Sequence, residues 1–231
     1  MLFNKVNKWL KNNHTCVLCG LHPANTFGIC DDCMSDLPWS ISCCHQCGRP
    51  TPFPTKQICT CCLKHAPAFD TTLATFRYVF PIDRLLPSIK YAKKTSHLGW
   101  LSSLMSEYIL SKDLPLPDAL VPVPMHPWDE IKRGYNQSSL LTHLISKQLT
   151  LPAHLGAIRK IKRTPHQKEL NFIERQQNLI DCFRLNKPLP KRVAIVDDVM
   201  TTGSTVNEIS RLLKNNGVET VDIWVLARTP E

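Results

Sequence analysis

Two adjacent carboxylates and a hydroxyl-rich loop are the residues best suited to chemistry in this chain. Residues 193–205 read VAIVDDVMTTGST, so an apolar run leads into Asp197 and Asp198 and a small polar loop follows at 201–205. Such a loop, placed between a buried strand and a helix, offers free backbone N–H groups, hydroxyl donors and the positive end of the helix dipole to an anion. The stretch therefore predicts a pocket for a ligand with both a phosphate and hydroxyls, such as a ribose phosphate. The alternative, a solvated acid pair in a structural turn, is disfavoured because burying unpaired charge is costly.

Clustered cysteines predict a second kind of chemistry. Ten of the eleven cysteines lie within residues 16–62, a density that indicates metal binding rather than disulfides in a chain without a secretion signal. The candidate ligands form four Cys-x-x-Cys pairs: Cys16/Cys19, Cys30/Cys33, Cys44/Cys47 and Cys59/Cys62. Four thiolates suit a closed, tetrahedral and therefore structural Zn²⁺ site. Sequential and interleaved pairing both fit, and Cys43 and Cys61 each abut a ligand and could replace it.

Positive charge is concentrated in the middle of the chain. The net charge is +9, and most of the excess lies in residues 71–190, which favours polyanionic partners. The candidate contacts to DNA, or to pyrophosphate from a closing loop, are Lys90, Arg133, Arg159, Lys160, Lys162, Arg163, Lys168 and Arg175. Solvated helix ends and surface loops are the alternative. The aromatic side chains that could stack on bases are Trp39, Phe53, Trp100 and Trp128, although packing in a small core is the expected role of each.

Length and composition limit the protein class. A chain of 231 residues with 43% apolar residues can bury one ordinary core with a small appendage. It contains no apolar run of about 18 residues, so no transmembrane segment is expected. Residues 1–13 lack the apolar region of a secretion signal and could form one amphipathic helix. The expected location is the cytoplasm, with attachment to the inner membrane only through a partner.

Apolar periodicity predicts the elements that position these groups. Strands are expected at 72–80, 119–123, 157–161, 193–196 and 224–229, and helices at 82–94, 98–109, 140–145, 171–180 and 206–213. Pro122 and Pro124 argue against a regular interior strand at 119–123. The fold class is therefore α/β, with a small zinc-finger module at residues 1–65 and a mostly parallel sheet at residues 66–231. The ligand is expected at the carboxyl ends of the strands.

Residues 193–205 resemble the 5-phosphoribosyl-1-pyrophosphate (PRPP) signature of type I phosphoribosyltransferases. Further motifs resemble a narrower group, the ComF family of competence protein F and GntX-like proteins. In chain order these are the Cys-x-x-Cys pairs, VPVP at 121–124 with His126, RGYNQS at 133–138, Arg163-Thr164 with Gln167, Arg175 with Asn178, and WVLART at 224–229.

The resemblance implies a type I phosphoribosyltransferase-like fold in which Asp197 and Asp198 are the catalytic pair. The implied PRPP-binding residues are Val199, Met200, Thr201, Thr202, Gly203, Ser204 and Thr205 around the phosphate, with Pro124, Met125 and His126 at the pyrophosphate. Mg²⁺ would arrive with PRPP, because it prefers phosphate oxygens and neutralises the leaving group. His126 and Tyr135 are candidates for polar contacts.

Three functions remain open at this point. The first, implied by the resemblance and the basic middle segment, is a component of natural competence that handles imported single-stranded DNA in the cytoplasm, with PRPP as a ligand or regulator. The second is a Mg²⁺-dependent phosphoribosyltransferase with an unknown acceptor. The third is a zinc-dependent adaptor for a helicase or translocase partner.

Overall fold

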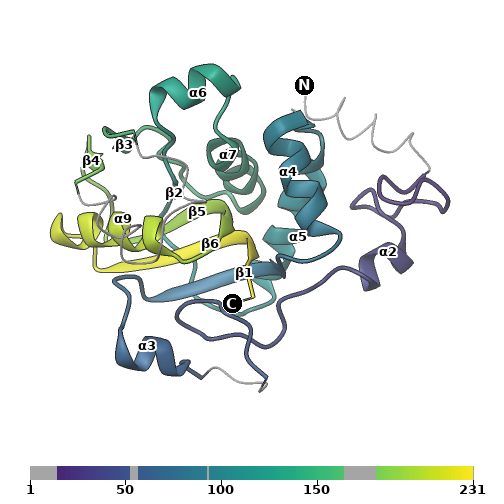
Figure 1. Cartoon of the computed structure of the whole chain (residues 1–231), viewed down its shortest axis with the longest axis horizontal. Coiled ribbons are helices and arrows are strands. Elements are labelled where there is room, and N and C mark those ends of the chain that lie inside the picture. The colour runs from purple at the N-terminus through teal and green to yellow at the C-terminus, as the bar shows by residue number, and fades with distance from the viewer. Residues whose placement is uncertain (1–14, 53–56, 93, 164–180, 231) are drawn as a thin grey trace.

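A four-stranded parallel sheet forms the centre of the protein (Figure 1). The computed structural model describes residues 15–52, 57–92, 94–163 and 181–230. The strand order is β1-β6-β5-β2, and all three strand pairs are parallel. The strands of this sheet are β1 (Thr71–Arg77), β2 (Ala119–Pro122), β5 (Arg192–Met200) and β6 (Thr220–Arg228). The expected α/β class with a mostly parallel sheet is confirmed.

The two central strands are the most apolar segments of the chain. Residues 193–196 of β5 and 221–228 of β6 are buried throughout, because helices cover both faces of the sheet. A strand covered on both faces reads as a continuous apolar run rather than as an alternating pattern. This is why the sequence predicts the first half of β5, expected at 193–196, whereas the strand itself continues through the acid pair to Met200.

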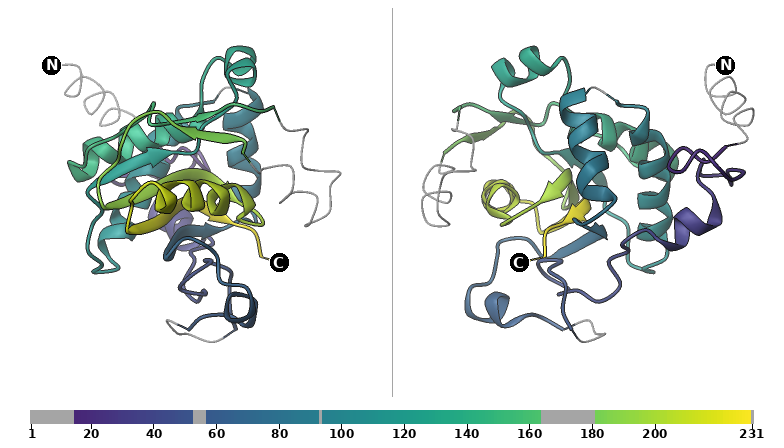
Figure 2. Two further views of the ribbon diagram at one scale, coloured as in Figure 1. Left: turned by 90° about the vertical axis from the view of Figure 1, so that its left-hand side faces the viewer. Right: turned by 45° about the vertical axis from the view of Figure 1, so that its right-hand side comes forward.

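Helices cover the sheet on both sides (Figures 1 and 2). The helices are α2 (Asp31–Ser35), α3 (Thr60–Lys64), α4 (Ile82–Ala92), α5 (His97–Leu110), α6 (Pro127–Arg133), α7 (Gln137–Leu149) and α9 (Ser204–Asn215). One apolar cluster joins α4, α5 and α7 to the sheet residues Ala194, Val196 and Trp224. A second cluster joins α9 to Ile195 and Val225 on the opposite face. The loop before α9 is thereby fixed at the carboxyl end of β5.

One expected strand lies outside the main sheet. The segment expected at 157–161 forms β3 (Ile158–Lys160), which pairs antiparallel with β4 (Phe183–Leu185) in a separate two-stranded sheet. Only tertiary packing decides which sheet so short a strand joins. The helices expected at 1–13 and 171–180 lie outside the described residues.

The strand that ends in Pro122 lies at an edge of the main sheet, where proline is tolerated. The segment expected at 119–123 forms β2 (Ala119–Pro122), which has β5 as its neighbour in the sheet and a single bridge from Leu120 to Ala153 on its other side. Proline cannot donate to a ladder hydrogen bond, so a strand that ends in Pro122 is suited to an edge. The Val123 N–H still bonds to the Val196 carbonyl (3.0 Å), which keeps the loop after β2 beside the end of β5.

The cysteine-rich segment packs on the sheet at two separate places. Its first half contributes Ile29 and Leu37 to the cluster beneath α4 and α5. Its middle lies along β1, where the Ser40 N–H bonds to the Thr75 carbonyl (3.0 Å) and the Arg77 N–H to the Pro38 carbonyl (2.7 Å). Figure 1 shows α2 and α3 well apart at the margin of the sheet. The segment therefore covers the edge of β1 that the sheet leaves unpaired.

A buried arginine at the end of β6 joins three parts of the fold. The Arg228 side chain is only 1% exposed. Its Nε donates to the Cys47 carbonyl (3.0 Å), and its Nη1 donates to the carbonyls of Met200 (3.2 Å), Thr229 (3.0 Å) and Thr201. The guanidinium thereby fastens the end of β5 and the following loop to the cysteine-rich segment.

We expect Arg228→Met to lower the free energy of unfolding by about 3 kcal/mol, because several buried carbonyls would lose a charged donor. The measurement is chemical denaturation in the presence of zinc. Arg77→Met, at the exposed end of β1, is the matched control and should change stability by less than about 0.5 kcal/mol. Equal effects of the two substitutions would contradict the role assigned to Arg228.

Candidate functional site

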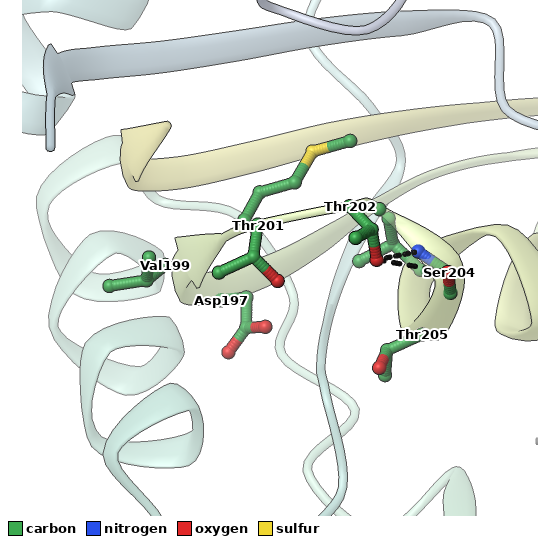
Figure 3. A pocket seen from close by; sticks show the side chains of 9 residues that line it. Asp197, Val199, Thr201, Thr202, Ser204 and Thr205 are labelled. Atoms are coloured by element: carbon green, nitrogen blue, oxygen red, sulfur yellow. Dashed lines mark hydrogen bonds between the residues drawn. The ribbon is translucent and has the colours of Figure 1, made fainter. Parts of the chain in front are cut away.

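The end of β5 and the start of α9 enclose one pocket (Figure 3). Its lining consists of Asp197, Val199, Met200, Thr201, Thr202, Gly203, Ser204, Thr205 and Val206. The structure thus gathers one acid of the pair and the whole predicted loop around a single hollow. Figure 3 shows the Asp197 carboxylate and the Thr201 and Thr205 hydroxyls around it.

Gly203 gives the loop its shape. It precedes α9 with a left-handed φ of 81°, a conformation that only glycine adopts without strain. A Cβ at this position would lie 2.5 Å from the Met200 Cε. The first turn of a helix leaves its backbone N–H groups without intrahelical partners, so the start of α9 presents donors and positive potential to the pocket.

Two hydroxyls in the loop are already oriented. The Thr202 and Ser204 Oγ atoms lie 2.9 Å apart, and the Ser204 N–H donates to the Thr202 Oγ1 (3.3 Å). Figure 3 shows this pair at the start of the helix. Together with Thr201 and Thr205 they provide the hydroxyl-rich lining that a tetrahedral oxyanion requires.

Asp197 is the electrostatically perturbed member of the acid pair. Its Oδ1 accepts hydrogen bonds from the Ser138 hydroxyl (2.7 Å) and from the Asp198 N–H (2.9 Å). Burial of the carboxyl, together with the charge of the neighbouring Asp198 carboxylate, raises the pKa of Asp197 to about 8, although the two hydrogen bonds act in the opposite direction. The charged form of Asp197 is therefore unfavourable in the free protein and would be stabilised by a ligand that supplies donors or a cation.

Asp198 lies beside this pocket but does not line it. Its Oδ1 accepts the Val199 N–H (2.9 Å). Burial raises the pKa of Tyr78, and the carboxylates of Asp83 and Asp198 add to that increase, which indicates that Tyr78 is close to the acid pair. The surroundings of the two acids therefore differ. Asp197 lies beside the loop at residues 201–205, whereas Asp198 lies toward the start of α4.

The residues expected at the pyrophosphate lie outside this pocket, and their contact with that group stays a prediction. Pro124, Met125 and His126 are absent from the lining of the phosphate pocket. They follow the neighbouring strand β2, and the His126 Nδ1 accepts the Trp128 N–H (3.3 Å) as the N-cap of α6. Tyr135 donates its hydroxyl to the Ile89 carbonyl, which is a contact within the fold. These contacts fix the backbone beside the pocket.

Most of the predicted basic residues that the structure describes surround α6 and β3. Arg163 pairs with Asp129 of α6 (3.1 Å), and Arg133 donates to the Gln137 Oε1 (2.6 Å). Burial lowers the pKa of Lys160, and the nearby Asp129 opposes that change.

The other basic candidates are spread along the chain. Arg159 and Lys162 are exposed on or beside β3. Lys90 lies apart on α4, with its Nζ 5.7 Å from the centre of the Tyr91 ring. Lys168 and Arg175 lie outside the described residues.

Three residues that organise the pocket were not among the expected site residues. Ser138 bonds directly to Asp197, and Asn136 caps α7 through the Ser138 N–H (3.0 Å) while its Nδ2 donates to the Val123 carbonyl (3.0 Å). Arg228 holds the carbonyls where the loop begins. All three belong to the RGYNQS and WVLART motifs, so a signal was present, but nothing in either motif indicates which element each side chain will contact.

The cysteines form two separate sets of four. Cys16, Cys19, Cys30 and Cys33 make one group and Cys44, Cys47, Cys59 and Cys62 the other, with all four Sγ atoms of each group within 4.8 Å of one another. Each group therefore combines two Cys-x-x-Cys pairs that are consecutive in the chain, which is the sequential arrangement. Cys43 and Cys61 belong to neither group, and Cys61 is exposed.

The geometry of both groups fits Zn²⁺. A Zn–S bond of about 2.3 Å in a tetrahedral site places thiolates about 3.8 Å apart. The distance from the Cys19 Sγ to the Cys30 Sγ is 3.8 Å, and that from the Cys47 Sγ to the Cys59 Sγ is 3.7 Å. A hydrogen bond from the Cys47 thiol lowers the pKa of the Cys44 thiol to about 4, so a thiolate is available in the second group. Four protein ligands leave no open position, which makes the zinc structural.

The parallel sheet, with the acid pair and the hydroxyl-rich loop at its carboxyl end, defines a phosphoribosyltransferase-like domain. The two groups of four thiols define a double zinc ribbon. The family described as the phosphoribosyl transferase domain matches residues 137–231, and the double zinc ribbon domain matches residues 13–63. The sequence is 35% identical over 230 residues to competence protein F of Haemophilus influenzae, covering 94% of this chain and 97% of that protein. The chain belongs to the ComF family.

Two further relatives agree with this assignment. DNA utilization protein YhgH of Salmonella typhi is 35% identical over 220 residues, which is 93% of this chain and 96% of that protein. Competence protein ComFC of Bacillus subtilis is 29% identical over 101 residues, which is 42% of this chain and 39% of that protein. Among the helices that the structure describes, none has the length and apolar character needed to cross a membrane.

We expect the purified protein to contain two zinc ions per chain, one for each group of four thiols. Cys30→Ser should remove one ion and destabilise the protein, because a structural zinc site contributes directly to folding. The measurement is metal analysis by mass spectrometry together with thermal unfolding.

Cys61→Ser is the matched control, since its exposed thiol adjoins the ligand Cys62 but lies outside both groups. It should retain both ions and the thermal stability of the wild type. Loss of zinc from Cys61→Ser, or two ions retained by Cys30→Ser, would show that the ligand sets are assigned wrongly.

Proposed function

We propose that this protein binds PRPP or a related ribose phosphate and handles imported single-stranded DNA during natural transformation. The observation that carries the first part is the enclosure of the Asp197 carboxylate and the loop 201–205 in one pocket at the carboxyl end of β5. The phosphate would occupy the start of α9, and the ribose hydroxyls would bond to the acid pair. Mg²⁺ would enter with the pyrophosphate, whose charge it neutralises beside Asp197 and Asp198.

The DNA part of the proposal is supported by charge and by the named relatives. Competence protein F and DNA utilization proteins match nearly the whole chain. The exposed basic side chains of Arg159, Lys162 and Arg163 lie on and next to β3. Lys and Arg on one surface bind a phosphate backbone by releasing its counterions. Thiolate groups of this kind need a reducing environment, which favours action in the cytoplasm.

A phosphoribosyltransferase remains the second candidate, favoured by the raised pKa of Asp197. A carboxyl group perturbed in this way within a pocket is typical of catalytic sites. The acceptor would have to enter near Asp198 and Tyr78, because Asp197 and the loop line the pocket that the phosphate would occupy. A helicase or translocase partner docked on the zinc ribbons is compatible with either activity.

We expect PRPP binding with Mg²⁺ to strengthen about tenfold between pH 7 and pH 9. The free protein holds the pKa of Asp197 at about 8, whereas bonding to ribose hydroxyls requires the carboxylate. Binding therefore releases a proton below pH 8, and the affinity rises with pH until Asp197 is ionised in the free protein as well. Calorimetric titration in buffers of different ionisation enthalpy measures both quantities.

Asp197→Asn should bind PRPP more weakly and with no dependence on pH over this range. A pH dependence that persists in this variant would assign the proton to another group. The same titration with pyrophosphate detection and a panel of nucleobases separates binding from turnover. Pyrophosphate release would favour the second candidate.

We expect single-stranded DNA binding to weaken steeply with salt. The double variant Arg159→Ala/Lys162→Ala should reduce the slope of log K against log salt by about 1.4, since each phosphate contact to a single strand contributes about 0.7. Fluorescence anisotropy of a labelled oligonucleotide measures the slope.

Lys191→Ala is the matched control for this experiment. Its exposed ammonium pairs with Glu219 at the amino ends of the central strands, just before β5 begins. Its slope should equal that of the wild type. Wild-type protein without salt-dependent binding to single-stranded DNA would sink the DNA part of the proposal.

A further inference from the structure

The short helix α6 exposes a tryptophan. Trp128 is 70% exposed and Ile131 is 75% exposed, and their spacing of three residues places them on the same side of the helix. The expectation that Trp128 packs in a small core is therefore wrong. The other tryptophans that the structure describes do pack: Trp100 and Trp224 are buried, and Trp39 contacts Phe76 and Tyr108. A large exposed indole beside a second exposed apolar side chain is typical of a surface that binds a partner.

The backbone that carries Trp128 is held rigidly. Pro127 occupies the first turn, His126 caps the helix start, and Gly134 ends the helix in a left-handed conformation. The Arg163–Asp129 ion pair joins the middle of α6 to the segment after β3. An aromatic ring on an element fixed at both ends loses little entropy when it binds, so it can act as a preorganised contact.

The surroundings of this apolar pair are cationic. Lys132 and Arg133 end the helix, Arg163 is paired with its Asp129, and Lys162 precedes Arg163 in the chain. The acid Asp129 is paired with Arg163, which leaves Glu130 as the remaining acid of the helix. An aromatic side chain among Lys and Arg is the combination that binds unpaired bases and their phosphates together. A duplex presents no free base face, and two apolar residues make too narrow a face for a lipid surface.

The helix also lies at the same edge of the fold as the phosphate pocket. It follows β2, the neighbour of β5, and leads into α7, whose Ser138 bonds to Asp197. Figures 1 and 2 show α6 at the margin of the molecule, clear of the sheet. A DNA strand bound to α6 would therefore pass beside the site proposed for the ribose phosphate.

We propose that Trp128, supported by Ile131, is the face on which an unpaired base of single-stranded DNA stacks. The cations Lys132 and Lys162 bind the phosphates on either side of that base. This inference rests on the proposed handling of single-stranded DNA and assigns it a surface and a principal side chain. The surface recognises bases without regard to sequence, because every base has a face that can stack.

The test compares an oligothymidylate with an abasic deoxyribose-phosphate chain of equal length, each titrated against the full-length, zinc-loaded protein. Trp128→Ala should weaken binding of the oligothymidylate about tenfold, the effect expected for one stacked base, and should change binding of the abasic chain by less than about twofold. Trp128→Phe should retain most of the affinity, since phenylalanine also stacks. Leu21→Ala, at an 80% exposed site on the first zinc ribbon, should change neither.

Tryptophan fluorescence supplies an independent measurement. The oligothymidylate should quench the wild-type protein more than it quenches Trp128→Phe, because only the wild type retains the indole beneath the base. Equal binding of the oligothymidylate by wild type and Trp128→Ala overturns the inference and leaves the proposed function intact. If Trp128→Ala weakens binding of the oligothymidylate and of the abasic chain equally, α6 contacts phosphate alone. That result also overturns the inference. Wild-type protein that binds neither chain overturns the proposed function and this inference together.

Discussion

The fully buried guanidinium of Arg228 is the contact on which the site depends. It donates to backbone carbonyls of the second zinc ribbon, of the last residue of β5 and of the phosphate loop. A buried charge is tolerated only when its donors are satisfied, and here carbonyl oxygens satisfy them. The shape of the loop and the docking of the ribbon are therefore coupled through one side chain. Metal binding in the ribbon helps to hold the Cys47 carbonyl that Arg228 requires.

Zinc explains how a cysteine-rich segment with few large apolar residues can cover the edge of a sheet. The ribbon segment makes backbone hydrogen bonds with β1, and its two thiol groups lie on different parts of the fold. Each metal ion fixes a small knuckle that packing alone would leave unstable. The ribbons thus stabilise the α/β domain as well as themselves, although the boundary predicted near residue 65 stays a prediction.

The charge of the acid pair is only partly stabilised in the free protein, and a ligand would stabilise it further. Burial and mutual repulsion oppose the simultaneous ionisation of Asp197 and Asp198, and the Ser138 hydroxyl offsets only part of that cost. Sugar hydroxyls or a hydrated cation would complete the hydrogen bonding of both groups. On the same edge of the sheet, α6 exposes a tryptophan among cations. The polar pocket and this exposed tryptophan therefore both follow the carboxyl ends of neighbouring strands.

The sequence by itself determined the elements and chemistry that are encoded locally. The apolar run before Asp197, the glycine-containing loop and the Cys-x-x-Cys spacing predicted β5, the phosphate pocket and the zinc sites, because neighbouring residues make them. Tertiary structure alone decided everything that joins distant segments. It selected sequential pairing of the thiols, took β3 out of the main sheet, brought Ser138 to Asp197 and left Trp128 exposed. Each of these outcomes depends on which elements pack together, and a local pattern carries no information about the packing partner.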